Sequence, residues 1–287
     1  MSEILHNLLQ RTTRARNRFD HERFRVLVNY ICWMCDNPHT LGPSRLGRVI
    51  WYSERNAFLE TGRWISGATF VRHHAGPHPR PLEPTLQELE REGMIARRLA
   101  DEGCEFDLLF AIKRPDLSQL QPIEISVIDA VVGVICFESR DRLAHHSAHD
   151  TVWRTAQIGE QLPHFTVFAG RPGDILPVDI DWATRVARAS RSAESASSSD
   201  KLISPDDIRA ADTLKLEAIE AALWHLNHNP SIGTSLPTSD ASWFVYKQSR
   251  HLKLAVPEVA VVYRFDVNEL MLEALRLDDP SDDDESF

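Results

Sequence analysis

Cysteine is scarce in this sequence, with 4 residues among 287. That number is too small for a disulfide-built scaffold of this length, and it fits a reducing compartment. The sequence also lacks the roughly 18 uninterrupted apolar residues that a membrane helix needs. Its first ten residues carry Glu3 and His6 where a secretory signal has Lys or Arg. We therefore expect a soluble, cytoplasmic protein with no membrane contact.

Basic residues are in the minority, since 32 lysines and arginines face 42 acidic residues and the formal net charge is −10. Phosphate attraction needs a concentrated positive face, so this balance excludes a generally basic nucleic-acid binder while allowing a local basic patch. Six of the acids lie within residues 278–287. We expect that segment to be a disordered acidic tail.

Three common motifs of catalysis and nucleotide binding are absent, namely GxSxG, GxxxxGKS/T and GxGxxG. Their absence removes the simplest sequence arguments for a serine hydrolase, a P-loop enzyme or a dinucleotide-binding enzyme. Other enzymes stay open, and no cofactor is expected.

The length exceeds the roughly 100–200 residues of one domain, so we expect two domains. Gly and Pro are dense at residues 169–173, which indicates a boundary. The pattern predicts an α+β protein with a mostly helical first domain that has a small sheet, and a second domain of two helices and an antiparallel sheet. Its parts are a basic N-terminal extension at 1–19, the first domain at 20–170, the second domain at 174–277 and the acidic tail at 278–287.

Apolar spacing sets the elements expected in the first domain. Helices are expected at 24–35, 42–62, 85–92 and 141–158, the last with Leu143, Val152 and Ala156 inward. Strands are expected at 65–72, 106–112 and 122–127, and an extended loop at the Pro-rich and His-rich residues 73–84.

The second domain is expected to place its helices before most of its strands. Helices are expected at 182–193 and from a Ser204–Asp207 cap to Leu226, separated by the Ser-rich residues 194–200, and the second helix ends at 229–233. Strands are expected at 175–180, 243–248, 251–256, 259–265 and 269–277.

Two blocks of the first domain carry a family-like pattern. The first comprises residues 46–53 (LGRVIWYS), 60–71 (ETGRWISGATFV) and 74–77 (HAGP), and the second is residues 141–153 (DRLAHHSAHDTVW). Together they resemble the Panacea (SocA-like) antitoxin domain over roughly residues 20–170. The resemblance implies a domain that neutralises a toxin by protein–protein binding.

The resemblance also indicates which residues matter. Arg and Trp are favoured interface anchors, and glycines permit a helix stop and tight turns. The candidate interaction surface is Arg63, Trp64, Arg72, His73, His74 and His149, and the structural positions are Gly62, Gly67, Gly76, Pro77 and Trp153. We expect Trp153 to anchor its helix in the core. Ala148 stands where the family has a histidine, and Gly47 or Arg48 stands in place of a lysine.

The second domain contains residues 222–236 (ALWHLNHNPSIGTSL) and 259–266 (VAVVYRFD). These segments resemble the RelE/ParE toxin superfamily. Ala260 stands at the position of the family's strand arginine, and acids follow Leu277 in place of the usual terminal Arg or aromatic residue. The resemblance implies a toxin-like domain that lacks part of the catalytic charge.

Four cationic or titratable residues of the second domain fall on two strands predicted to be adjacent. They are Lys247, Arg250, His251 and Lys253. One interpretation is an RNA- or target-facing patch, in which Lys and Arg bind phosphate and an imidazole transfers protons. The other is a solvated sheet face whose charges discourage edge pairing.

Histidine and cysteine clusters raise the question of a metal site. His73, His74 and His78 form one cluster and His145, His146 and His149 another, but neither brings a carboxylate or cysteine at a familiar spacing. Cys32 and Cys35 form a CxxC, which fits a redox pair, half a zinc site or packed core thiols. Helical spacing and the lack of a second CxxC favour core thiols, so no metal is expected.

These patterns predict a toxin–antitoxin protein with an antitoxin-type domain fused to a RelE/ParE-like domain. The expected partner is a cognate toxin or the fused second domain itself, with RNA or the ribosome as a further partner of the second domain. One alternative is a self-inhibited RNA-cleaving or translation-inhibiting toxin. Another is a non-enzymatic interaction protein of a mobile element.

Overall fold

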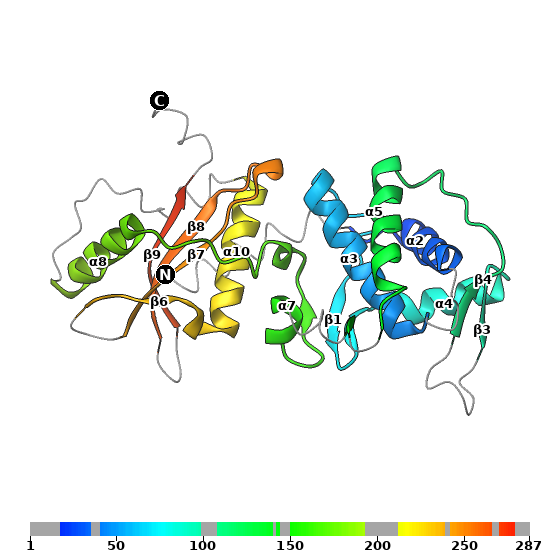
Figure 1. The fold of residues 1–287 in the computed structure, drawn as a ribbon, viewed down its shortest axis with the longest axis horizontal. Helices are drawn as coiled ribbons and strands as arrows, with labels where there is room; N and C mark the ends of the chain where they lie inside the picture. Colours follow the sequence, from blue (N-terminus) through cyan, green and yellow to red (C-terminus); the bar gives the residue numbers. More distant parts are fainter. Residues whose placement is uncertain are drawn as a thin grey trace. The chain divides into compact units, whose positions relative to one another are not determined.

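The computed structural model describes residues 18–35, 41–98, 108–139, 142–143, 150–192, 212–238, 242–265 and 270–278. They belong to two compact units, one within residues 18–164 and the other within 165–278. Helices and separate antiparallel sheets make this an α+β protein, as predicted (Figure 1). No helix within the described ranges is long and apolar enough to cross a membrane.

Three helices form the centre of the first unit: α2 (His21–Met34), α3 (Pro43–Thr61) and α5 (Pro122–Ile135) (Figure 1). The Asp20 side chain caps α2. Helix α3 ends at Gly62, whose φ of 71° is the left-handed geometry that glycine adopts most easily. The sequence predicted α2 and α3 nearly at these bounds.

The prediction of a strand at 122–127 is wrong, because these residues begin α5. Pro122 occupies the first turn, and Gln121 and Glu124 cap each other's backbone. Glu124 also forms an ion pair of 2.6 Å with Arg23 of α2. The β-branched residues of this segment favour a strand locally, but packing against α2 and α3 selects the helix.

A small antiparallel sheet in the order β2-β1-β5 lies beside α3. Its strands are β1 (Phe70–His73), β2 (Gly76–Pro79) and β5 (Gln161–Leu162). Strand β2 lies in the segment expected to be a loop, and its prolines are tolerated because β2 is the edge strand. A Cβ on Gly47 of α3 would lie 2.9 Å from the Pro77 carbonyl oxygen, so glycine allows this close approach.

The other elements of the first unit are shorter. They are α4 (Leu82–Arg91), β3 (Ile95–Arg98), β4 (Leu108–Ala111) and α7 (Thr151–Thr155), and a 3₁₀ turn at His164–Val167 spans the boundary to the second unit. Helix α4 and strand β4 confirm predictions, whereas β3 was not predicted. The helix expected at 141–158 contributes only α7 after residue 149, although Leu143, Val152 and Ala156 are buried as expected.

The second unit is built on an antiparallel sheet in the order β6-β7-β8-β9. The strands are β6 (Thr234–Ser235), β7 (Trp243–Gln248), β8 (Glu258–Phe265) and β9 (Leu270–Asp278). Strands β7, β8 and β9 confirm three predicted strands. The strand expected at 251–256 is wrong, because these residues form a tight loop that a bridge between His251 and Val256 closes.

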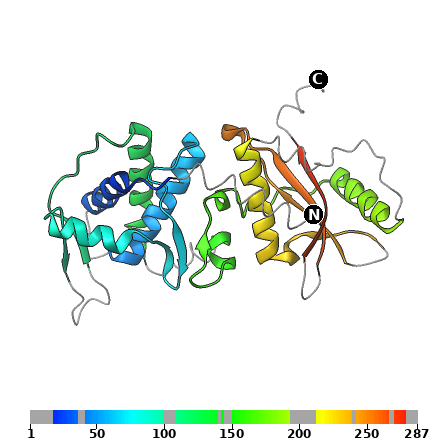
Figure 2. The ribbon, with the colours of Figure 1, turned by 180° about the vertical axis from the view of Figure 1, so that it is seen from behind.

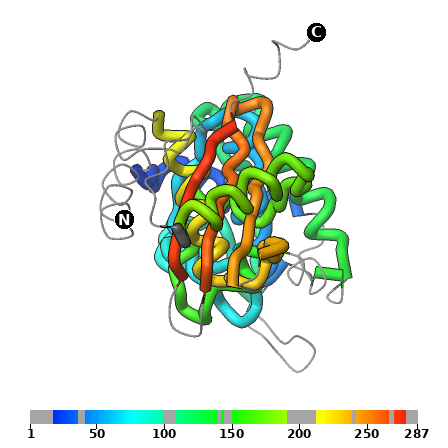
Figure 3. The backbone as a smooth tube through the Cα atoms, turned by 90° about the vertical axis from the view of Figure 1, so that its left-hand side faces the viewer, coloured from blue at the N-terminus to red at the C-terminus, as the bar shows by residue number. Residues whose placement is uncertain are grey.

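Two helices cover opposite faces of this sheet, α8 (Pro177–Ser192) and α10 (Thr213–His228) (Figures 2 and 3). Trp243 of β7 shares a core with Trp182 of α8. Tyr246 of β7 points to the other face of the sheet and contacts His225 of α10. Its hydroxyl lies 3.1 Å from the imidazole Nδ1. Because both faces are covered, β8 is an almost unbroken apolar run. Residues 175–180, expected to be a strand, lead into α8 instead.

Candidate functional site

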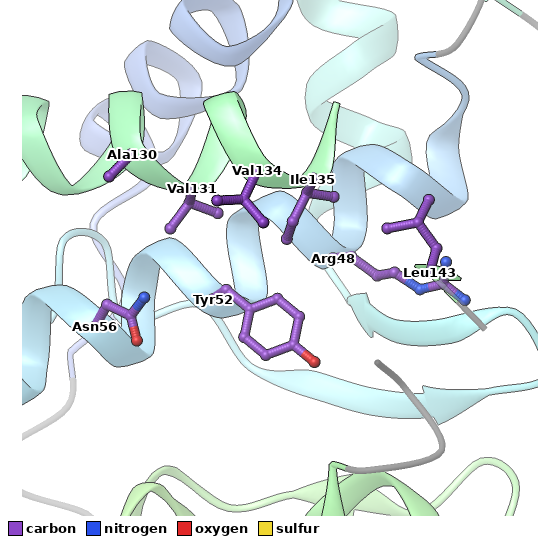
Figure 4. A pocket seen from close by; sticks show the side chains of 8 residues that line it. All are labelled: Arg48, Tyr52, Asn56, Ala130, Val131, Val134, Ile135 and Leu143. Carbon is purple, nitrogen blue, oxygen red and sulfur yellow. The ribbon is translucent and has the colours of Figure 1, made fainter. Parts of the chain in front are cut away.

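A groove lies between α3 and α5 in the first unit. It encloses a cavity of about 290 Å³ whose floor is mostly apolar. Figure 4 shows the apolar side chains along α5 opposite the polar side chains along α3. We call it the α3–α5 groove, and its lining residues are Arg48, Tyr52, Asn56, Ala130, Val131, Val134, Ile135 and Leu143.

Arg48 is the cation of the groove, and it has no carboxylate partner in the described part of the chain. Its buried Nε atom has no hydrogen-bond acceptor. Burial lowers the pKa of the guanidinium; nearby Tyr52 opposes this decrease, and the like charge of Arg45 adds to it. A guanidinium stays charged even so, which leaves one positive charge at the end of an apolar groove.

Arg45, one turn earlier on α3, has a different environment. Its guanidinium donates to the carbonyl oxygens of Ile135 and Cys136 at 3.0 and 2.8 Å, where α5 ends. These contacts satisfy carbonyls that have no partner within the helix. Arg45 therefore joins α3 to α5, whereas Arg48 is available to a ligand.

On one side of the groove, Asp150 links Tyr52 to Trp51 and to α7. The Asp150 carboxylate accepts a hydrogen bond of 3.0 Å from the Trp51 indole and caps α7 through the Trp153 N–H. Burial raises the pKa of Tyr52 above its usual range, and the charge of Asp150 raises it further. The Tyr52 hydroxyl is therefore neutral at physiological pH and hydrogen-bonds to Asp150.

A row of solvent-exposed apolar residues runs along α5 and shares Ala130 and Val134 with the rim of the groove. Ile123 is 43% exposed, Val134 53% and Phe137, just past the helix, 66%. Ala130 and Gly133 continue the same row. The row, which we call the α5 outer face, extends ~21 Å at 1.5 Å per residue. Exposed apolar rows of this kind indicate an interaction surface.

The tip of the β1–β2 hairpin and α7 form a second exposed surface. The Arg72 guanidinium lies 5.0 Å from the centre of the Trp153 ring and also donates to the Ala156 carbonyl. The Trp153 indole donates to the His73 carbonyl at 3.1 Å. His73 and His74 are exposed. The structure thus brings together Arg72, His73, His74 and Trp153, which we call the hairpin surface.

Trp153 does not occupy the position expected for it in the core. It is half-buried and contacts the hairpin, while its neighbour Val152 is buried. Asp150 starts a new helix at Thr151, so Trp153 lies in its first turn and its side chain points to the hairpin. The deeply buried tryptophan of this region is Trp51.

Arg63 and Trp64 lie in a separate loop that follows α3. The buried Glu54 carboxylate fixes this loop by accepting from the Ile65 and Ser66 N–H groups at 2.8 and 3.0 Å. Burial raises the pKa of Glu54, although the hydrogen bonds from the loop oppose this effect. Trp64 stacks on Phe58 and contacts His164, and Arg63 is exposed. His149 lies outside the described residues.

The structural glycines adopt the backbone geometry that they were expected to provide. Gly62, Gly67 and Gly76 have φ values of 71°, 69° and 136°, all in the region that other residues rarely adopt. Gly76 also contacts Arg48, because a Cβ at position 76 would lie 2.8 Å from the Arg48 Nε. Pro77 is buried in β2.

Lys247 does not belong to an exposed cationic patch. Its ammonium is buried between the carboxylates of Asp179 and Glu258, at 3.2 and 2.9 Å. Arg276 pairs with the same Asp179 at 2.5 Å. Burial would raise the pKa of Asp179, but the Leu176 N–H and the two cations hold it below its usual range. These ion pairs join α8 to three strands of the sheet.

The other three residues of the expected patch lie at or beside the loop that replaces the expected strand. Arg250 and Lys253 are exposed, and His251 is half-buried. Their separation from Lys247 follows from the pleat, because Lys247 points to the α8 face of β7.

The cysteine and histidine clusters give no metal site within the described ranges. Cys32 and Cys35 are buried, and burial raises the pKa of the Cys32 thiol to about 12. This environment is that of core thiols, as the helical spacing predicted. His73 and His78 have ring centres 5.8 Å apart. His145, His146 and His149 lie outside the described residues.

The sequence alone missed Arg48 and the α5 outer face. Arg48 lies within two residues of the apolar positions 46, 49 and 50 of α3, and the sequence offered no further reason to place it in a groove. The α5 outer face was hidden because residues 122–127 were assigned to a strand.

Comparisons with known proteins add no relative. No family model matches the chain, and neither a curated protein nor a solved structure matches it. A function for this chain therefore has to be argued from the α3–α5 groove, the α5 outer face, the hairpin surface and the motifs.

Proposed function

We propose that this protein is the antitoxin component of a cytoplasmic toxin–antitoxin system and that residues 18–164 neutralise a separate toxin by binding it. The observation that carries the proposal is the α5 outer face. Water contacts the apolar side chains of Ile123, Val134 and Phe137 on one side of α5, which costs free energy that a partner protein recovers by covering them.

The hairpin surface supports the same proposal. Arg and Trp are enriched among residues that dominate binding energy, and Arg72 and Trp153 already lie in contact there. A ready-made pair loses less side-chain freedom when a partner binds. Neutralisation of this kind needs a complementary surface and no catalytic group in the antitoxin.

The second unit gives less support to an RNA-cleaving function. Its lysine at position 247 is committed to two carboxylates, and Ala260 is buried in β8. We propose that this unit is a RelE/ParE-like domain without catalytic activity. Arg250 and Lys253 are its exposed cations near the loop at 251–256.

Growth measurements test the proposal. The protein encoded by the neighbouring gene is expressed alone, with the whole chain, and with the double variant Val134→Glu/Phe137→Glu. The proposal requires that the neighbouring protein expressed alone arrests growth, that the whole chain restores growth, and that the double variant does not restore it. Leu252→Glu is the matched control, because Leu252 is 72% exposed in the second unit and should still allow rescue. Rescue by the double variant would contradict the proposed surface.

A further inference from the structure

Arg48 is half-buried, and no carboxylate among the described residues balances its charge. A half-buried cation is normally compensated by a carboxylate, since isolated charges lose hydration when they leave water. Arg276 illustrates compensation, with Asp179 at 2.5 Å and Asp278 at 2.8 Å. Arg48 has no such partner in the described part of the chain, so an anion from outside would stabilise it.

The Arg48 side chain lies against the backbone of β2 at Gly76. Its Nε and Cγ atoms lie where any side chain at position 76 would have to be, at 2.8 and 3.2 Å from a Cβ built there. Gly76 therefore leaves the space that the Arg48 side chain occupies against β2. A preorganised guanidinium loses little conformational freedom when it binds a carboxylate.

The length and the apolar lining of the groove determine what kind of group can lie beside an anion bound to Arg48. Arg48 and Asn56 are eight residues apart on one helix, so the groove is ~12 Å long. Its α5 side consists of Ala130, Val131, Val134 and Ile135. An aliphatic chain has no polar groups to satisfy there, whereas an extended peptide would leave its amides unpaired. A second helix, ~10 Å wide, is too thick for a groove between two helices in contact.

We propose that the α3–α5 groove binds a small amphipathic carboxylate, whose aliphatic chain lies along α5 and whose carboxylate is held by Arg48 (Figure 4). A single guanidinium matches the single negative charge and the planar geometry of a carboxylate. The site is distinct from the α5 outer face, although Ala130 and Val134 border both.

Calorimetric titration of the whole chain with octanoate tests this proposal. Octylammonium and octan-1-ol are the matched probes, with the same chain and a positive or neutral head. We expect octanoate to bind at least tenfold more tightly than either. Arg48→Gln should weaken octanoate binding by about 10-fold to 100-fold, the usual worth of a hydrogen bond to a charged group.

Arg55→Gln is the control variant, because Arg55 lies on the same helix over the Trp51 ring and outside the groove. It should leave the affinity for octanoate unchanged, and thermal unfolding should show that both variants are folded. Equal binding of the three probes, no binding of octanoate, or unchanged affinity in Arg48→Gln would overturn the proposal. So would an amphipathic helical peptide with one glutamate that displaces octanoate and binds more tightly. None of these outcomes depends on a toxin, so they leave the proposed function to its own test.

Discussion

The two units differ in whether their buried charges have partners of opposite charge. In residues 165–278, Asp179, Lys247 and Arg276 neutralise one another across α8 and the sheet. In the first unit, Arg48 has no carboxylate partner among the described residues, and α5 exposes apolar side chains. The difference indicates that the first arrangement serves folding, while the second is completed only by a molecule from outside. Four measurements test this difference between the units.

The largest effect is expected from Asp179→Ala. It removes the carboxylate that Lys247 and Arg276 share and leaves them only Glu258 and Asp278, so the free energy of unfolding should fall by about 3 kcal/mol, the lower end for a broken buried pair. Urea unfolding of the whole chain measures it. Asp278→Asn is the control, because its side chain is 40% exposed and its loss should cost less than about 1 kcal/mol. A loss below 1 kcal/mol for Asp179→Ala would remove the contrast between the units.

Glu220 of α10 is an exception within the second unit. Burial and the nearby charge of Glu217 raise its pKa to about 8, from 4.5 in an exposed chain. The unfolded chain ionises first, so stability should fall as pH rises from about 4.5 to about 8. Glu220→Gln should remove most of this fall, a gain of about 2 kcal/mol at pH 8 and little at pH 4.

Unfolding temperatures at pH 5 and pH 8 measure the Glu220 effect. Glu22→Gln, at an exposed carboxylate of the first unit, should leave the difference between the two temperatures unchanged. The same temperature difference in Glu220→Gln as in the wild type would show that Glu220 does not cause the fall in stability.

Trp153→Ala should cost about 1–2 kcal/mol, because it removes one hydrogen bond and one cation–π contact from the surface. Trp51→Ala is the comparison, and loss of that buried ring should cost about 3–5 kcal/mol. Chemical denaturation of both variants decides between a surface and a core role. Equal losses of unfolding free energy in the two variants would show that Trp153 belongs to the core, as the sequence predicted.

The smallest effect on stability is expected from Val134→Ser/Phe137→Ser. Both side chains are mostly exposed, so the free energy of unfolding should change by no more than about 0.5 kcal/mol. Neutralisation of the toxin should nevertheless be lost. A large loss of stability would mean that the α5 outer face is part of the fold.

The sequence predicted elements whose signals are local. Pro43 and Gly62 bound α3, and a run of β-prone residues identified β7. It failed where packing decides between two local options, as at Pro122–Val127, where β-branched residues were assigned to a strand. The α+β class follows from the first kind of signal.

The candidate site was harder to predict because it depends on partners that are distant in the sequence. Lys247 pairs with Asp179, 68 residues away, so its burial is invisible in the local pattern. Arg48 has no carboxylate partner among the described residues, which only a three-dimensional arrangement reveals. The hairpin surface was predicted in part, through Arg72, His73 and His74.

The contact between Gly76 and Arg48 has an evolutionary consequence. Any side chain at position 76 would displace the guanidinium, so the two positions are constrained jointly. Among homologous chains, Arg at position 48 should occur with Gly at position 76, and chains that replace the glycine should be free to lose the arginine. Covariation of two residues 28 positions apart would then distinguish lineages that retain the anion site from those that retain only the fold.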